Sequence, residues 1–342
     1  MQYRNWRGKH VGILGKFAVA AALLSLVGLT VTPVGAMASS AHASTSKVIY
    51  VIGYEQANPF WVLEGVGAAQ AGKALGVTVR YEAPTTASDA GMIALIDAAL
   101  ATHPYGIAID YTDHAMQASV LAALKEGVKV VLYNNNRFEP QSGGATKNSA
   151  ITQLAYVGQT ESHSGAVLGA AFLPFLPKTG NVLIINPYAG AYVLTLRANG
   201  LTSVLHPAGH TTSTLVVNGD SSEGTIEAVI SAYLKAHTSV VGVAALGDPA
   251  GNPAARAIAA AGLKIPVCTF DMETETYQLM KSGGPLKAAL DQQPYLQAYY
   301  AVQDLAFQMR DGFQPVSVNT GTLVVTKANL AALTLLINSG KD

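Results

Sequence analysis

Short apolar runs alternate with longer stretches of helical pattern along most of the chain. The first run covers residues 48–52 and is rich in β-branched residues, which favours a buried strand. The Asn58-Pro59 pair that follows predicts a helix start, because proline fixes φ and suits a first helical turn. In an open α/β sheet, such a loop lies at the carboxyl end of its strand, where ligands bind. Asn58, Phe60 and Trp61 are therefore candidates for the lip of a cleft, although the two rings would equally well pack the helix onto the sheet.

The same alternation continues to residue 134. It predicts βαβ units on a parallel sheet with helices on both faces. Because parallel strands end on the same edge, the strand-end residues Asp110, Asn134 and Asn135 join Asn58 there. A single strand-end Asp is more often a helix cap, so the argument depends on the whole set. The predicted strands cover residues 77–82, 106–110 and 129–134, and the predicted helices cover residues 87–102 and 114–126.

A stretch rich in Gly, Ser and Asn, residues 137–153, interrupts this rhythm and predicts a surface loop. A second series of strands and helices follows, which predicts a second sheet and a second lobe without an internal sequence repeat. Its predicted strands cover 154–158, 181–186, 213–218, 240–245 and 267–270, and its predicted helices cover 162–175, 192–205, 221–237, 253–261 and 273–282.

The N-terminal segment has the pattern of a secretory signal. Residues 1–10 carry three basic residues and no acidic one, and residues 17–31 form an almost unbroken apolar run. We expect residues 1–43 to be the signal peptide, with cleavage after Ala43 and with Ala36 or Ala38 as rival sites. The apolar run is shorter than the roughly 20 residues of a transmembrane span, which argues against an anchor. The protein is therefore expected to be periplasmic or secreted.

Composition narrows the class of partner. Only 12% of the 342 residues are charged, and the N-terminal segment contains four of the 21 basic residues and none of the 21 acidic ones. The remainder is net negative, so we expect no nucleic-acid partner. The single cysteine, Cys268, leaves no lipid-bearing cysteine after cleavage and no internal disulfide, and its apolar surroundings in the sequence predict a small buried side chain.

Four short motifs then resemble one family in the same order along the chain. They are Asn58-Pro59-Phe60-Trp61, Arg197-Ala198-Asn199-Gly200-Leu201, Thr269-Phe270-Asp271 and Asp291-Gln292-Gln293-Pro294-Tyr295-Leu296-Gln297. The chain is similar to type I periplasmic sugar-binding proteins, the solute receptors of ABC transporters, and to the ribose-binding branch in particular.

The resemblance implies an α/β fold of two Rossmann-like lobes with parallel sheets, joined by a three-segment hinge. It implies an N-terminal lobe of residues 47–159 plus 293–321 and a C-terminal lobe of residues 160–292 plus 322–342. The chain would cross between the lobes near residues 157–160, 290–293 and 321–325.

The resemblance also implies a set of ligand-binding residues drawn from both lobes. They are Asn58, Phe60, Trp61, Asp110, Asn134, Asn135, Gln159, Arg197, Phe270, Asp271 and Gln292. The chain departs from the family pattern in three places. Asn134-Asn135 replaces an Asp-Arg pair, Asp110 adds a carboxylate, and no aromatic residue lies in the sequence near residues 218–220.

The resemblance implies a receptor that encloses a sugar, a polyol or a sugar derivative by hinge closure and presents it to ABC permease subunits. An amine-bearing ligand, or a sensor that docks on a signalling receptor, remains open. A hydrolase is disfavoured, because nothing places a base beside the serines of residues 219–224. His206 and His210 are separated by Pro207 and Gly209, which favours a solvated turn over a metal site. We expect a monomer without cofactor, metal or catalytic residue.

Overall fold

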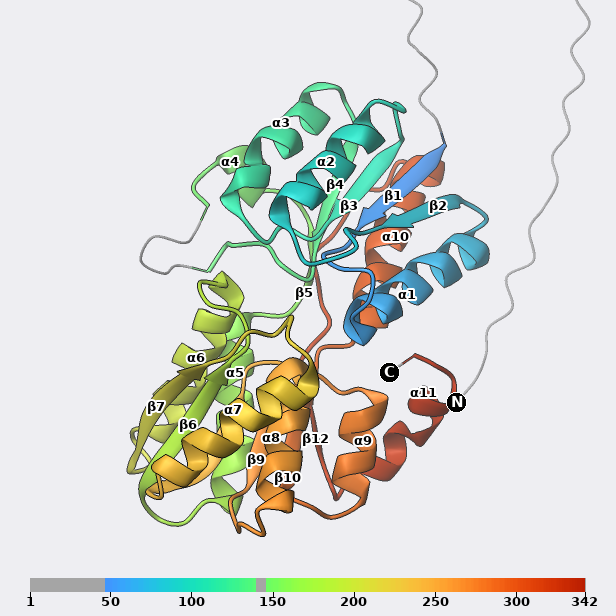
Figure 1. Ribbon diagram of the computed structural model, residues 1–342. Helices are drawn as coiled ribbons and strands as arrows, with labels where there is room; N and C mark the ends of the chain where they lie inside the picture. Colours follow the sequence, from blue (N-terminus) through green and yellow to red (C-terminus); the bar gives the residue numbers. More distant parts are fainter. Residues whose placement is uncertain (1–46, 140–145, 342) are drawn as a thin grey trace, which may run out of the picture. The chain divides into compact units, whose positions relative to one another are not determined.

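The computed structural model describes residues 47–139 and 146–341, so the predicted signal peptide lies outside the described residues. Residues 44–342 form one compact unit that contains two six-stranded sheets (Figure 1). We call each sheet, with the helices packed on it, the first lobe and the second lobe. The predicted α/β fold of two mostly parallel sheets is confirmed.

The first lobe has a parallel sheet with helices on both faces. Alternate residues of its first strand point to opposite faces, as a strand requires. Ile49 and Val51 pack in the cluster that contains Ala68 of α1, while Tyr50 and Ile52 pack in the cluster that contains Met92 of α2. The strand order is β11 (Val318–Asn319), β5 (Tyr156–Gly158), β4 (Lys129–Tyr133), β3 (Gly106–Ile109), β1 (Val48–Ile52) and β2 (Thr78–Glu82). The helices are α1 (Pro59–Leu75) and α10 (Pro294–Asp311) on one face, and α2 (Asp89–Leu100) and α3 (Gln117–Lys125), preceded by η1 (His114–Met116), on the other.

The second lobe repeats this architecture with one antiparallel edge strand. In it, β12 (Leu323–Thr326) pairs antiparallel with β10, and all other pairs are parallel. The strand order is β12, β10 (Leu286–Asp291), β9 (Val267–Phe270), β8 (Val240–Ala245), β6 (Gly180–Asn186) and β7 (His210–Val216). One face carries α5 (Glu161–Phe172) and α6 (Tyr192–Leu205), and the other carries α7 (Glu223–Ala236), α8 (Asp248–Ala260) and α9 (Thr274–Lys281).

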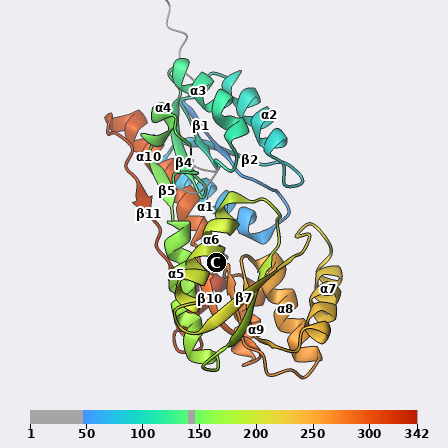
Figure 2. The same cartoon turned by 90° about the vertical axis from the view of Figure 1, so that its left-hand side faces the viewer.

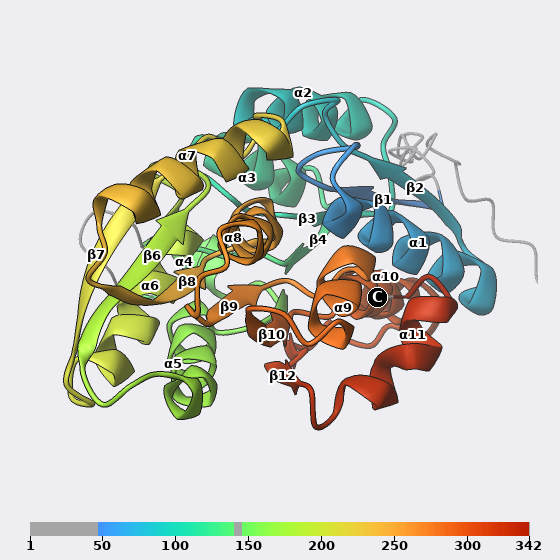
Figure 3. The ribbon, with the colours of Figure 1, turned by 60° about the horizontal axis from the view of Figure 1, so that its bottom comes forward.

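The chain passes between the two sheets three times. It leaves the first sheet after β5, returns to it from β10 through α10, and leaves it again between β11 and β12 (Figure 2). The last segment, η3 (Leu330–Leu333) and α11 (Thr334–Asn338), packs beside α9, where the Tyr277 and Thr334 hydroxyls are 2.9 Å apart (Figure 3). The residue limits predicted for the two lobes stay a prediction.

Several local predictions differ from the structure. The strand predicted at residues 154–158 was assigned to the second sheet, but β5 pairs with β4 and β11 in the first. The loop predicted at residues 137–153 contains α4 (Ser149–Thr152), which begins because the Asn148 side chain caps it. Strand β7 begins at His210, so this residue is a buried strand residue rather than part of a solvated turn. Helix α8 begins at Asp248, five residues before the predicted start, because Pro249 suits its first turn and Pro253 is tolerated one turn later.

Other expectations hold. Cys268 is a free, buried thiol in β9, as its apolar neighbours predicted. Among the helices of residues 47–139 and 146–341, none has both the length and the apolar character that crossing a bilayer requires.

Candidate functional site

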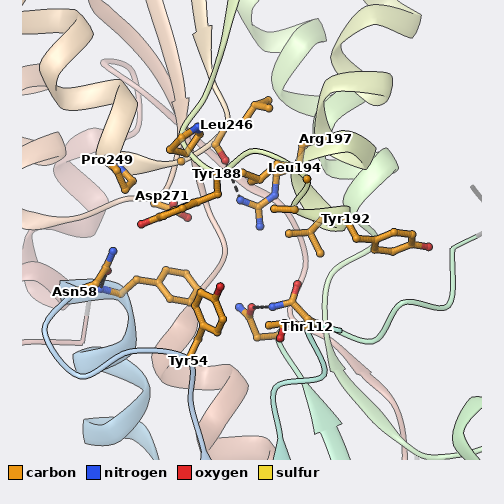
Figure 4. Close-up of a pocket in the computed structure, with 18 of the residues that line it drawn as sticks. Tyr54, Asn58, Thr112, Tyr188, Tyr192, Leu194, Arg197, Leu246, Pro249 and Asp271 are labelled. Atoms are coloured by element: carbon orange, nitrogen blue, oxygen red, sulfur yellow. Dashed lines mark hydrogen bonds between the residues drawn. The ribbon is translucent and has the colours of Figure 1, made fainter. Parts of the chain in front are cut away.

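A cavity of about 710 Å³ lies between the carboxyl ends of the two sheets. Its walls are the segments that follow β1 to β4 of the first lobe and β6 to β10 of the second, including residues of α1, α2 and α6. Figure 4 shows Tyr54 and Asn58 on one side of this space, and Tyr188, Asp271 and Arg197 on the other. The cavity occupies the position where open α/β sheets bind ligands.

Eight of the eleven predicted ligand-binding residues line this cavity, and three lie behind its wall. The lining residues are Asn58, Phe60, Trp61, Asn134, Asn135, Arg197, Asp271 and Gln292. Asp110, Gln159 and Phe270 are buried and do not line it. Each of these three supports a side chain that does.

Three aromatic rings form a cluster on the first-lobe wall. The Trp61 ring centroid is 5.7 Å from that of Tyr54 and 4.8 Å from that of Phe60. The Asn58 Oδ1 accepts a hydrogen bond from the Phe60 N–H and so caps α1. Phe60 is only 6% exposed and belongs to the core, whereas Trp61 is half-buried at the cavity. Of the two roles considered for the rings, Phe60 therefore packs the helix onto the sheet, and Trp61 lies at the cavity.

Asn134, Asn135 and Asp110 form a buried network at the ends of β3 and β4. The Asn135 amide donates to Asp110 Oδ1 and to Asn134 Oδ1, both at 2.6 Å, and Asn134 donates to Gln297 Oε1 at 2.9 Å. These bonds use both amide protons of Asn135, so only its carbonyl oxygen can meet a ligand. Burial raises the pKa of the Asp110 carboxyl well above its usual range, so the neutral acid is favoured. Asp110 therefore positions Asn135 and does not present a charge to the cavity.

Arg197 comes from α6 and meets Glu161 of α5 because the two helices pack unusually closely. A Cβ on Gly165 would lie 2.1 Å from the Arg197 carbonyl oxygen, and one on Gly200 would lie 2.0 Å from the Ser162 carbonyl oxygen. The two glycines therefore permit the approach. The Arg197 guanidinium also lies 4.4 Å from the centre of the Phe270 ring, so Phe270 is a platform for the arginine rather than a wall of the cavity.

Asp271 and Gln292 join the cavity to the crossover segments. Gln292 donates to Asp271 Oδ1, and its own Oε1 accepts from Gln159 at 2.9 Å and from Arg197 at 2.8 Å. Asp271 Oδ2 accepts from the Asp248 N–H at 3.2 Å, which supplies the cap that Gly247 cannot give α8. Gln159 and Gln292 thus connect two of the chain crossings to the residues that line the second-lobe wall.

Sequence reasoning missed several lining residues from loops whose positions depend on tertiary structure. Tyr188 follows β6, and a Cβ on Gly219 would lie 2.6 Å from its Cζ. Tyr188 thus brings an aromatic ring next to residues 218–220, where the local sequence contains none. Applying the strand-end rule to β6 as it was applied to β1 would have found it. The missed polar and aromatic lining residues include Tyr54, Asp89, Thr112, Arg137, Tyr188 and Tyr192.

Burial alters the acid–base properties of the walls. It raises the pKa of Tyr54 to about 12, with Asp89 adding to the shift, and it also raises the pKa of Tyr188. Burial raises the pKa of Asp248 well above its usual range, and the nearby carboxylates of Glu273 and Asp271 add to the shift. Burial also raises the pKa of Glu273 to about 7, with a further contribution from Asp271. The Tyr54 and Tyr188 phenols are therefore neutral groups that can donate and accept hydrogen bonds, which suits a polyhydroxylated ligand.

Comparison with known proteins places this geometry in a family. The family model described as the periplasmic binding protein domain matches residues 49–312. The xylose/arabinose-binding protein XylF of Sulfolobus acidocaldarius is 25% identical over 304 residues, which cover 84% of this chain and 72% of that protein.

Solved structures share the fold over nearly their whole length. A carbohydrate transporter from Acidothermus cellulolyticus, crystallised with myo-inositol, is 27% identical and has a TM-score of 0.75, over 86% of this chain and 99% of its own. An ABC sugar transporter protein from Legionella pneumophila, described as a periplasmic sugar-binding protein, is 25% identical with a TM-score of 0.72, over 81% of this chain and 100% of its own. The family match covers most of both sheets and the cavity between them, and the chain therefore belongs to the periplasmic binding protein family, as its four motifs predicted.

Proposed function

We propose that the protein is the extracytoplasmic solute-binding component of an ABC importer and that it captures a sugar or polyol in the cavity. The observation that carries the proposal is the composition of the walls, where aromatic rings face amide, carboxylate and guanidinium groups across one space. Rings cover the apolar C–H faces of a sugar while the polar groups bond its hydroxyls. The relatives support this choice, since one is named for xylose and arabinose and another was crystallised with myo-inositol.

The ligand would bind through groups that no single lobe possesses. Asn58, Trp61 and Asn135 belong to the first lobe, and Arg197 and Asp271 belong to the second. A ligand that touches both sets favours the arrangement in which they are close, so binding shifts the population toward a closed state. The cavity volume lies within the range of about 300–1,000 Å³ that is usual for small-molecule sites.

Export and delivery complete the proposal. The basic and apolar pattern of residues 1–43 would direct secretion, and the closed receptor would dock as a monomer on permease subunits. A sensor that presents the same closed form to a signalling receptor would bind the same ligand. Permease and ATPase genes beside this gene would favour the importer, and a receptor gene beside it would favour the sensor.

A thermal-shift screen of residues 44–342 tests the binding step. We expect one class among pentoses, hexoses, cyclitols and amino sugars to raise the melting temperature, because a ligand that binds only the folded state stabilises it by mass action. Calorimetry should then give a 1:1 complex from which the ligand is recovered unchanged. Absence of a shift across all neutral carbohydrates would contradict the proposal, and turnover of the ligand would favour the hydrolase.

A further inference from the structure

We infer that Glu161 makes the cavity selective for uncharged ligands by neutralising Arg197 from behind, so that carboxylated or phosphorylated sugars are rejected although an arginine lines the wall. The inference rests on the proposed function and adds the charge class of the ligand and the residue that sets it. Glu161 does not line the cavity itself, so it acts through Arg197 as a positioning residue.

The hydrogen-bonding capacity of Arg197 is almost fully used inside the protein. Its Nε donates to Glu161 Oε2 at 2.6 Å, and its Nη2 donates to Glu161 Oε1 at 3.3 Å and to Gln292 Oε1 at 2.8 Å. Its Nη1 donates to the Leu246 carbonyl oxygen at 3.0 Å. A guanidinium has five N–H groups, so these four bonds leave one for a ligand. The two parallel N–H groups that would hold a ligand carboxylate are already on Glu161.

The charge of Arg197 is compensated at the same place. Glu161 is 4% exposed and Arg197 is 5% exposed, and both carboxylate oxygens of Glu161 face the guanidinium. Burial raises the pKa of Glu161, and the adjacent guanidinium opposes that rise. Burial lowers the pKa of Arg197, but its interactions, led by that with Glu161, outweigh this and the net shift is upward. A buried ion pair of this geometry has no net charge to offer an incoming anion.

The other charged groups of the cavity also disfavour an anion. The second arginine, Arg137, donates to the Thr112 carbonyl oxygen at 2.9 Å and lies 3.6 Å from Asp113 Oδ2. The positively polarised N-terminus of α8 is occupied by the Asp271 carboxylate. Within the described residues, no lysine or histidine lines the cavity. The acidic and basic lining residues are Asp89, Asp113, Arg137, Arg197, Asp248 and Asp271, and the raised pKa of Asp248 favours its neutral form.

Pairs of ligands that have similar shapes but differ in charge test the inference. The probes are glucose with glucuronate, galactose with galacturonate, and myo-inositol with myo-inositol phosphate, measured by calorimetry at pH 7.5. Whichever neutral probe binds, we expect its charged counterpart to bind the wild-type protein at least tenfold more weakly. In Glu161→Gln, one guanidinium charge is uncompensated while an isosteric acceptor remains. We expect the neutral-to-anion ratio to fall at least tenfold, mainly through tighter binding of the anion.

Two further variants keep the test decisive. Glu223→Gln also removes a carboxylate from an arginine, Arg256, but on the surface of α7, and it should leave the ratio unchanged. If Glu161→Gln does not fold, the double variant Glu161→Gln/Arg197→Gln removes both charges, and it should reject the anion as the wild type does.

Equal affinity of the wild type for both members of a pair, or an unchanged ratio in folded Glu161→Gln, would overturn the inference while leaving the proposed function intact. If none of these probes binds, the pair is made from the neutral carbohydrate found in the thermal-shift screen, and failure of every carbohydrate in that screen would contradict the proposed function instead.

Discussion

The guanidinium of Arg137 lies 4.4 Å from the centre of the Tyr192 ring, which joins the segment after β4 of the first lobe to the first residue of α6 in the second. The Tyr192 hydroxyl also donates to the Glu139 carbonyl oxygen. Both contacts lie at one side of the cavity, which Arg137 and Tyr192 line. Because each contact joins the two lobes, we expect both to favour an arrangement in which the walls are close.

Variants of Tyr192 test this relationship. Tyr192→Phe removes the hydrogen bond and keeps the ring, while Tyr192→Leu removes both contacts. A hydrogen bond and a cation–π contact each contribute about 1 kcal/mol. We therefore expect ligand affinity to fall about threefold to fivefold in the first variant and tenfold or more in the second, with a faster off-rate in stopped-flow experiments. Equal affinity in all three proteins would show that the contacts do not contribute to closure.

Phe60 and Trp61 should separate stability from affinity. Phe60 is 6% exposed, so Phe60→Leu should lower the melting temperature and change affinity less than threefold. Trp61 is half-buried and presents part of its ring to the cavity, so Trp61→Leu should lower affinity at least tenfold with a smaller change in melting temperature. Calorimetry and thermal denaturation of both variants measure the two effects. If Trp61→Leu mainly lowered the melting temperature and Phe60→Leu mainly lowered affinity, Trp61 would be a packing residue.

Sequence periodicity predicts the elements better than it predicts which side chains reach the cavity. The helix predicted at residues 192–205 and the strand predicted at 240–245 have the observed limits, because their apolar patterns are bounded by clear breaks. The strand-end rule also found the correct edge of the first sheet, whereas the residues of the second sheet were implied by the resemblance. Whether a strand-end side chain enters the cavity or lies behind it depends on neighbours distant in sequence. Asp110 and Phe270 lie behind it because Asn135 and Arg197 cover them.

Asp271 combines ligand binding with a local structural role, so its variants should differ from one another. Its φ of 73° is unfavourable for alanine, and its carboxylate caps α8. Asp271→Ala should lower ligand affinity at least tenfold, because a hydrogen bond to a charged group contributes about 1.5–3 kcal/mol, and it should lower the melting temperature by several degrees. Asp271→Asn tolerates this backbone and keeps one acceptor, so it should retain most of the stability. Unchanged affinity of Asp271→Ala in calorimetry would remove this residue from the site.

Glu64 should make the protein more stable in mild acid than in base. This residue of α1 is fully buried, and neither carboxyl oxygen has a hydrogen-bond partner of good geometry among the described residues. Burial, with a further contribution from Asp110, raises its pKa well above the usual value of 4.5. The folded state therefore favours the protonated acid.

The stabilisation from Glu64 is fully present below pH 4.5, the pKa of the unfolded chain, and is lost as the pH rises toward the raised pKa of the folded protein. Glu64→Gln removes the titrating group and keeps its shape. We expect it to raise the melting temperature at pH 8 more than at pH 5, as measured by circular dichroism. Glu126→Gln, on the exposed end of α3, makes the same charge change and should shift the two temperatures equally. If Glu64→Gln also shifts them equally, the wild-type Glu64 is not held in its protonated form by the fold.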